Sequence, residues 1–292
     1  MPLWIKLSKG VFFMAKRTRT SKIDKWIKEG RGSGIGSDYK PWLYIQDVSS
    51  SGRSGRPKGI KTGRQYDFLS DLERYYFYLA EYSDFVVDIR EQFPLLPLEE
   101  TIVIADELGI EHPTNPKNGE LNVMTTDFLL TLDKGKGVSE VARTIKMKDE
   151  LFKERVLEKF EIEREYWQRR NIDWAIVTDE DIPKTLARNL SYVHSPYYIK
   201  EYDVFREMNE KHIEELAISL MQRLLNQTNS IRAITNEFEF DTHLPFGSGL
   251  TLFYHLIAQK IIQINLLEDL NVEQPIKIQS IDENRLKQVR YG

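Results

Sequence analysis

Apolar residues recur with helical or strand spacing over most of the chain from position 68 onward. Leu69, Leu72, Tyr76 and Leu79 follow one another every three or four residues, which predicts a helix over 68–82. The pattern then predicts strands at 85–89 and 101–104, a loop over 105–122, a hairpin of strands 126–132 and 138–147, a helix over 148–170 and a strand at 173–178. This order is typical of an α/β fold with a mixed sheet flanked by helices.

The pattern changes beyond position 183. Helices are predicted over 205–225, 229–238 and 248–260, and two short strands at 261–267 and 275–281. Three helices followed by two strands predict a winged helix-turn-helix domain. The predicted organisation is therefore a basic N-terminal arm over 1–66, a catalytic core over 67–183, a connector over 184–200 and a winged-helix domain over 201–292.

Four ionisable residues interrupt the apolar positions of the predicted core. Glu73 and Glu163 fall within the apolar stripes of their helices, Asp127 directly precedes the apolar run 128–130, and Lys146 ends an apolar strand. Buried charge is costly unless it is paired or bound to a metal. A salt bridge explains either glutamate taken alone, but the coincidence of all four residues favours a catalytic site.

Three carboxylates and a lysine at strand ends suit the Mg²⁺-dependent hydrolysis of a phosphodiester. Asp127 is expected to bridge two Mg²⁺ ions, Glu73 to hold one of them, and the backbone carbonyl of Ile145 to complete the site of the other. Lys146 is expected to orient the attacking water and to neutralise developing negative charge. Mn²⁺ is expected to substitute for Mg²⁺.

Composition removes several other kinds of site. The chain of 292 residues has no cysteine, which excludes disulfides, thiolate nucleophiles and zinc sites with cysteine ligands. Its five histidines show no zinc-binding spacing. No apolar run approaches the roughly 18 residues that a membrane span needs. A cytoplasmic protein without membrane contact is expected.

Charge is distributed unevenly along the chain. Residues 1–70 hold 15 Lys and Arg against 5 Asp and Glu, a balance of +10, whereas the remainder has a balance of −14. A basic segment rich in glycine and serine favours contact with nucleic-acid phosphates, with a flexible solvated linker as the alternative. The expected phosphate contacts are Arg53, Arg56, Lys58, Lys61 and Arg64.

The C-terminal region lacks this basic character. Residues 205–292 contain 9 basic and 12 acidic residues, and the helix predicted over 248–260 is mostly apolar. An exposed apolar face on that helix would suit a protein partner better than phosphate. The C-terminal domain is therefore expected to bind protein.

Asp127 and Lys146, on neighbouring strands of a hairpin, resemble the PD-(D/E)-x-K core of restriction-endonuclease-like enzymes. Longer strings between about 27 and 178 closely resemble the TnsA family, the endonuclease subunits of heteromeric transposases. The main strings are Ser70-Asp-Leu-Glu73, Val87-Asp-Ile-Arg-Glu-Gln-Phe-Pro94, Met124-Thr-Thr-Asp-Phe128 and Leu157-Glu-Lys-Phe-Glu-Ile-Glu-Arg-Glu-Tyr-Trp167. A looser resemblance covers 244–265.

The resemblance assigns catalytic roles to Glu73, Asp127, Lys146 and Glu163. Thr144 stands where the family pattern has glutamine, two residues before the lysine. The resemblance also implies an endonuclease that cuts the 5′ strands of transposon-end DNA, while a TnsB-type DDE transposase cuts the 3′ strands. A TnsC-type AAA+ regulator would bind the C-terminal domain. The alternative is a non-catalytic DNA-binding adaptor of the transposition complex with a degenerate nuclease core.

Overall fold

The computed structural model describes residues 22–48, 55–116, 118–225 and 228–286. A four-stranded sheet of order β1-β2-β3-β4 lies at its centre. β1, β2 and β3 are antiparallel neighbours, and β4 lies parallel to β3. The strands span Val86–Pro94, Thr125–Asp133, Val138–Lys146 and Asp173–Thr178. The predicted hairpin is confirmed, and its turn uses positive φ angles at Gly135 and Gly137.

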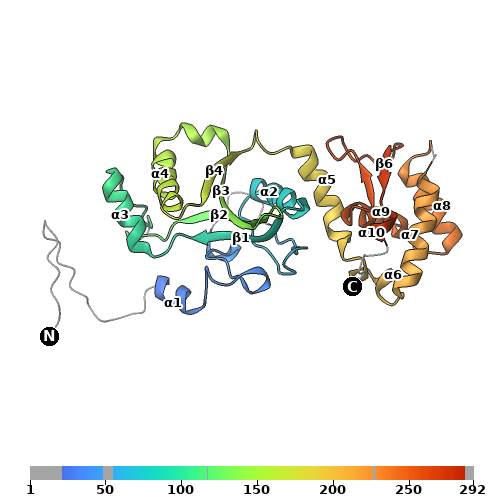
Figure 1. Ribbon diagram of the computed structural model, residues 1–292, viewed down its shortest axis with the longest axis horizontal. Helices are drawn as coiled ribbons and strands as arrows, with labels where there is room; N and C mark the ends of the chain where they lie inside the picture. The colour runs from blue at the N-terminus through green and yellow to red at the C-terminus, as the bar shows by residue number, and fades with distance from the viewer. Residues whose placement is uncertain (1–21, 49–54, 117, 226–227, 287–292) are drawn as a thin grey trace, which may run out of the picture.

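Helices cover both faces of this sheet (Figure 1). α2 (Asp71–Tyr82) packs on one face, where Phe77 meets Phe128 and Leu130 of β2 in an apolar cluster. α3 (Leu98–Leu108) and α4 (Glu154–Gln168) contribute to a second cluster around Leu129. Adjacent β2 residues thus join different clusters, as the alternation of a strand requires. This mixed α/β arrangement fits a restriction-endonuclease-like fold.

The prediction of a strand at 101–104 is wrong, because these residues belong to α3. Glu99 and Glu100 lie in the first turn of α3, where carboxylates favour a helix, and Gly109 ends it in the left-handed conformation. These end signals outweigh the strand preference of the short β-branched run. The helix also replaces the first part of the loop predicted over 105–122.

The helix predicted over 148–170 is present in two pieces. A 3-10 segment, η3 (Lys148–Phe152), follows β3, and α4 begins only after Lys153, whose backbone is extended. The break lets α4 run back along the sheet toward β4. Its buried residues are Ile162, Glu163, Tyr166 and Trp167, so the predicted inward position of Glu163 is confirmed.

The described residues before position 67 are folded against the core and do not form a free arm. After α1 (Lys22–Lys28) come two 3-10 turns, η1 (Gly36–Asp38) and η2 (Ile45–Asp47). Tyr39, Trp42 and Tyr66 are buried, and the Trp42 N–H donates to the carbonyl of Gln92 in β1 at 3.1 Å. The core therefore extends well before the predicted boundary at 67.

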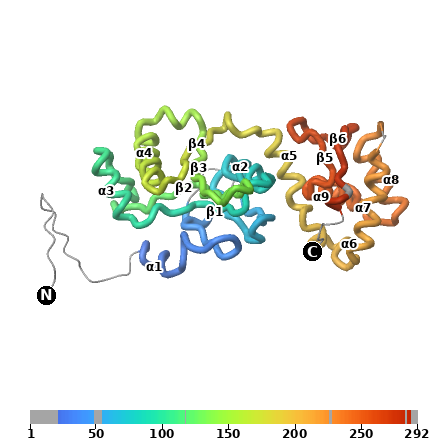
Figure 2. Tube along the Cα trace, viewed as in Figure 1, coloured from blue at the N-terminus to red at the C-terminus, as the bar shows by residue number. Residues whose placement is uncertain are grey.

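The segment predicted as a connector, 184–200, is mostly helical. Lys184–His194 form helix α5, followed by the 3-10 turns η4 (Ser195–Tyr197) and η5 (Ile199–Glu201). α5 lies between the sheet domain and the C-terminal helices (Figure 2). Ala187 packs in the cluster beneath α2, whereas Leu190 and Val193 pack in the C-terminal core. The two domains thus share a packed helix.

The C-terminal region contains helices followed by a small antiparallel sheet of β5 and β6. Their bounds are α6 Asp203–Arg206, α7 Glu210–Leu224, α8 Ile231–Thr242, α9 Ser248–Ala258, β5 Ile262–Ile264, β6 Ile278–Ile281 and α10 Glu283–Leu286. The three predicted helices and two strands are present; the winged helix-turn-helix assignment stays a prediction. Within the described ranges, no helix has the length and apolar character needed to cross a membrane.

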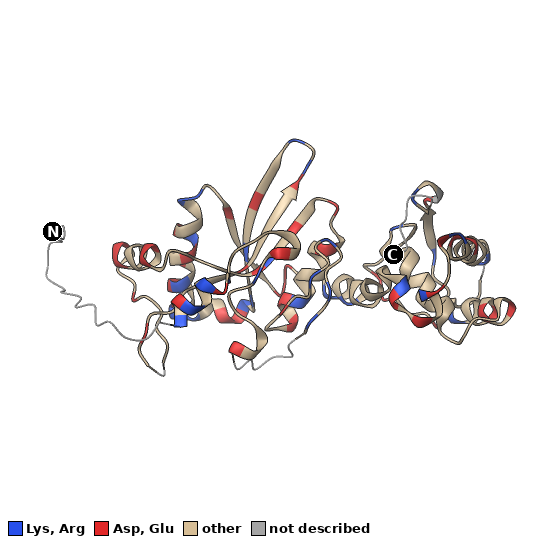
Figure 3. Ribbon diagram, turned by 90° about the horizontal axis from the view of Figure 1, so that it is seen from below, with Lys and Arg blue, Asp and Glu red and all other residues tan. Residues whose placement is uncertain are grey.

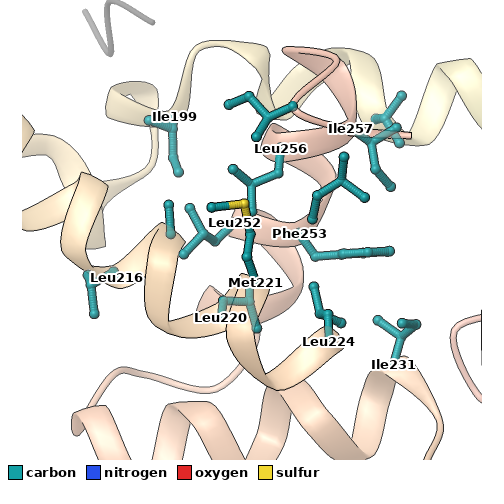
Figure 4. Close-up of a cluster of buried hydrophobic side chains, with 14 of the residues drawn as sticks. Ile199, Leu216, Leu220, Met221, Leu224, Ile231, Leu252, Phe253, Leu256 and Ile257 are labelled. Atoms are coloured by element: carbon teal, nitrogen blue, oxygen red, sulfur yellow. The ribbon is translucent and has the colours of Figure 1, made fainter. Parts of the chain in front are cut away.

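The prediction of an exposed apolar face on α9 is wrong. Leu252, Phe253, Leu256 and Ile257 are buried and pack against α7 residues such as Leu220 (Figure 4). The apolar residues of α9 therefore hold the domain together. Exposed aromatic side chains among the described residues of this domain include Phe240, near the end of α8, and Phe246, in the turn after it.

Candidate active site

Asp127 and Glu73, two of the predicted site residues, lie close to each other at the side-chain amide of Gln92. The side-chain amide nitrogen of Gln92 donates to Asp127 Oδ1 at 3.3 Å and to Glu73 Oε2 at 3.4 Å. Asp127 comes from β2, Gln92 from β1 and Glu73 from α2. Three separate elements thus bring two carboxylates to one amide group.

Glu73 owes its position to the start of its helix. Ser70 is the N-cap of α2 and accepts from the Glu73 N–H, while its hydroxyl donates to Glu73 Oε1 at 2.7 Å. The Leu69 N–H donates to Glu73 Oε2 at 3.1 Å. This reciprocal capping arrangement fixes the carboxylate on the inward face of α2.

Glu163, on α4, is hydrogen-bonded to the sheet through two threonine hydroxyls. Its Oε1 accepts from Thr126 at 2.6 Å and from Thr144 at 2.5 Å. Each threonine oxygen in turn accepts from an indole N–H, Thr126 from Trp167 at 2.7 Å and Thr144 from Trp174 at 3.1 Å. The Thr144 hydroxyl, which departs from the family pattern, is thus engaged with Glu163.

The carboxyl groups of Glu73, Asp127 and Glu163 all have pKa values above their usual range, and burial is the main cause in each case. Burial raises the pKa of Glu163, which is 3% exposed, to about 7. Burial and then the Asp127 charge raise the pKa of Glu73. Burial and the Glu163 charge raise the pKa of Asp127, against the opposing effects of the Ile145 N–H and Lys146. Binding of a cation by such carboxyl groups would displace their protons into the solvent.

Lys146 lies at the end of β3, within electrostatic reach of Asp127. Among the described residues its ammonium group forms no hydrogen bond or ion pair, and the residue as a whole is partly buried. The neighbouring Ile145 meets Asp127 through its amide, which donates to Oδ2 at 2.7 Å. The predicted residues Glu73, Asp127, Ile145, Lys146 and Glu163 therefore form one group.

Carboxylate oxygens, such as those of Glu73 and Asp127, are the type of ligand that Mg²⁺ prefers. Within the described part of the chain, no cluster of three or more His, Asp or Glu side chains could hold a metal ion. Mg²⁺ usually binds to one or two carboxylates and keeps several waters. Glu73 and Asp127 meet that requirement for one ion. A carbonyl ligand at Ile145 and a second ion stay predictions.

The basic residues predicted to bind phosphate are mostly engaged within the protein. Arg64 is not exposed for phosphate: it forms a buried ion pair with Glu91 and donates to the Ile89 carbonyl at 2.8 Å. Lys58 pairs with Glu201, and Lys61 donates to the Ser83 carbonyl at 2.8 Å. The remaining two are Arg56, paired with Asp67 at 2.8 Å, and Arg53, which lies outside the described residues.

Charged residues of both signs are interspersed over the two domains (Figure 3). Arg56 and Lys58 keep side-chain exposures of 50% and 47%. Their ion pairs lie at the surface, where such pairs contribute little and exchange readily with other anions. These two residues therefore remain available for phosphate, in contrast to Arg64.

Gln92 is a site residue that sequence reasoning missed. A neutral side chain gives no charge signal, and it lies in a strand predicted to end at 89, whereas β1 continues to Pro94. The available signal was the polar run Asp88-Ile-Arg-Glu-Gln92 inside a buried strand. Buried polar residues in such a run need hydrogen-bond partners, and the side-chain amide of Gln92 finds them in Glu73 and Asp127.

Comparison with known proteins identifies the family of this chain. The chain is 36% identical over 270 residues to the transposition protein TnsA of transposon Tn7 from Escherichia coli, covering 92% of this chain and 95% of that protein. This chain belongs to the TnsA family. Residues 83–179 match the family described as "TnsA-like endonuclease N terminal", and residues 181–266 match "TnsA endonuclease C terminal".

The two family matches meet close to the start of α5. The first contains Asp127, Lys146 and Glu163 but begins after Glu73, which comes to the site from α2. The second contains α5 and most of the C-terminal helices. Family membership identifies the chain as a Tn7-type transposition endonuclease subunit.

Proposed function

We propose that this subunit is a Mg²⁺-dependent DNA endonuclease that cuts the 5′ strands at transposon ends. The observation that carries the proposal is the convergence of Asp127 and Glu73 on one amide, beside Lys146 at the end of β3. Metal-assisted phosphodiester hydrolysis requires carboxylates that bind the metal ion and a nearby positive side chain, and these three residues supply both. The membership of the TnsA endonuclease family supports the same reaction.

Each residue has a distinct part in the proposed reaction. Glu73 and Asp127 would hold Mg²⁺, with Mn²⁺ as a substitute, and the ion when bound supplies positive charge to the phosphate and activates water. Lys146 would orient that water and neutralise charge on the phosphate oxygens. Glu163 would be the further catalytic carboxylate beside Asp127. The hydroxyls of Thr126 and Thr144 hold the Glu163 side chain in place.

The partners follow from the proposed reaction and from the relative. The relative is a transposition protein of transposon Tn7, so we expect this chain to act with transposon DNA and with other transposition proteins. A TnsB-type DDE transposase would cut the 3′ strands of the same ends. Transposon-end DNA would contact the sheet domain, with Arg56 and Lys58 exchanging their surface ion pairs for phosphate.

A TnsC-type AAA+ regulator would bind the C-terminal domain. Because α9 is buried, the support for this contact comes from two other side chains: Phe240 and Phe246 are 83% and 80% exposed. Exposed aromatic residues are enriched at protein interfaces. Replacing both with serine should weaken binding of the regulator in a pull-down and leave the nuclease site unchanged; unchanged binding would place the contact elsewhere.

The metal site is tested by Asp127→Ala in a reconstituted reaction. With Mg²⁺, transposon-end DNA and the partner proteins, wild-type protein should produce 5′-strand cuts and the variant none, because the variant lacks a ligand to the ion. Glu161→Ala, an exposed acidic change on α4, is the control and should cut normally. Undiminished 5′ cutting by the Asp127 variant would favour the non-catalytic adaptor.

A further inference from the structure

The backbone at Gln92 has a conformation that few side chains adopt. Its φ is +47°, in the left-handed region, although it lies within strand β1. A non-glycine residue is uncommon in this region and persists there only where the surroundings enforce the conformation. Such strain inside a buried strand calls for a function.

Contacts with the N-terminal segment support this conformation. The Gln92 carbonyl accepts from the Trp42 N–H at 3.1 Å, and Trp42 is itself 2% exposed. The preceding residue, Glu91, is 1% exposed and forms a buried ion pair with Arg64. The N-terminal segment thus holds β1 in place at this point.

The strained residue directs its amide between the two acidic residues. Gln92 Nε2 lies 3.3 Å from Asp127 Oδ1 and 3.4 Å from Glu73 Oε2. Gln92 Oε1 accepts from the Thr125 hydroxyl at 3.2 Å, which sets the orientation of the amide. Both carboxylates therefore face the same N–H donor group.

We propose that Gln92 is a positioning residue, which holds Glu73 and Asp127 toward each other so that the two can bind one divalent cation. Without the amide, two neighbouring carboxylates repel and turn apart, and binding a cation then requires both to be reordered. Residues that orient metal ligands typically contribute roughly 10–100-fold in affinity. This inference rests on the proposed metal-dependent function.

Calorimetric titration of the full-length protein with Mn²⁺ alone tests the inference. Gln92→Leu should weaken Mn²⁺ binding by roughly tenfold or more. Gln92→Gly also removes the amide but suits the left-handed backbone, so a parallel loss of affinity cannot be assigned to backbone strain. Gln259→Leu is the matched control, since it removes an amide hydrogen bond of 3.3 Å to the Tyr197 carbonyl, away from the acidic pair.

The outcomes separate the two claims. Wild-type affinity in both the Leu and the Gly variant of Gln92, with affinity lost in Asp127→Ala, would overturn the positioning role and leave the metal site intact. Mn²⁺ binding that Asp127→Ala does not reduce would overturn the metal site itself, and the positioning role with it. Weakened binding in both Gln92 variants, together with normal binding by Gln259→Leu, is the expected result.

Discussion

Glu163→Gln should make the metal-free protein more stable at alkaline pH while impairing cutting. The side chain is 3% exposed, and burial raises its pKa from 4.5 to about 7. Since each unit corresponds to about 1.4 kcal/mol, ionised Glu163 costs the folded state about 3 kcal/mol above pH 7. Glutamine has nearly the same shape, and its oxygen accepts the same two threonine hydrogen bonds.

The sign of the pH dependence follows from the raised pKa. A carboxyl group with a raised folded-state pKa favours folding below about pH 4.5, and this contribution is lost as the pH rises through about 7. Wild-type stability without metal should therefore fall between pH 5 and pH 8. The fall should be smaller in Glu163→Gln, and Glu73 and Asp127, whose pKa values are also raised, should cause what remains.

Urea unfolding in EDTA at pH 5 and pH 8 provides the assay. The described tryptophans, Trp26, Trp42, Trp167 and Trp174, all precede position 179, so their fluorescence reports on the sheet domain. Glu161→Gln, at a half-exposed position of the same helix, is the control and should keep the wild-type difference between the two pH values. The reasoning would be refuted if Glu163→Gln matched or fell below wild-type stability at pH 8.

Three further variants test the surroundings of the site. Arg64→Leu leaves the buried Glu91 without a counter-ion, so the free energy of unfolding should fall by about 3–5 kcal/mol in the same urea assay. Adding Glu91→Leu should recover much of the lost stability. A double variant no more stable than Arg64→Leu alone would contradict the ion-pair account. Thr144→Val removes a hydroxyl that holds Glu163, so the rate of 5′ cutting should fall roughly tenfold. An unchanged rate would show that this hydrogen bond does not position Glu163.

Much of the acidic cluster is predictable from the sequence, because an ionisable residue inside an apolar stripe is a strong signal. Glu73 and Glu163 share helix faces with buried residues, and the structure places both side chains inward. The hairpin is likewise predictable from strand spacing and its glycine turn. These features depend on residues close together in the sequence.

Features that depend on distant partners were not predictable. Arg64 reads as a free basic residue until β1 places Glu91 beside it. The buried state of Trp42 depends on the edge of the same strand. α5 carries helical spacing at Ala187, Leu190 and Val193, but only its packing between two domains distinguishes it from a connector. Long-range packing decides these cases, and local pattern does not.

The most direct test of the central claim is a strand-resolved map of the cuts made at transposon ends. The reaction would contain the full-length protein, a TnsB-type transposase, a TnsC-type regulator and Mg²⁺, with wild-type protein compared with Lys146→Met. The account predicts cuts on both strands with wild-type protein and 3′-strand cuts alone with the variant. Undiminished 5′-strand cuts with Lys146→Met, or the absence of 5′ cuts with wild-type protein, would contradict it.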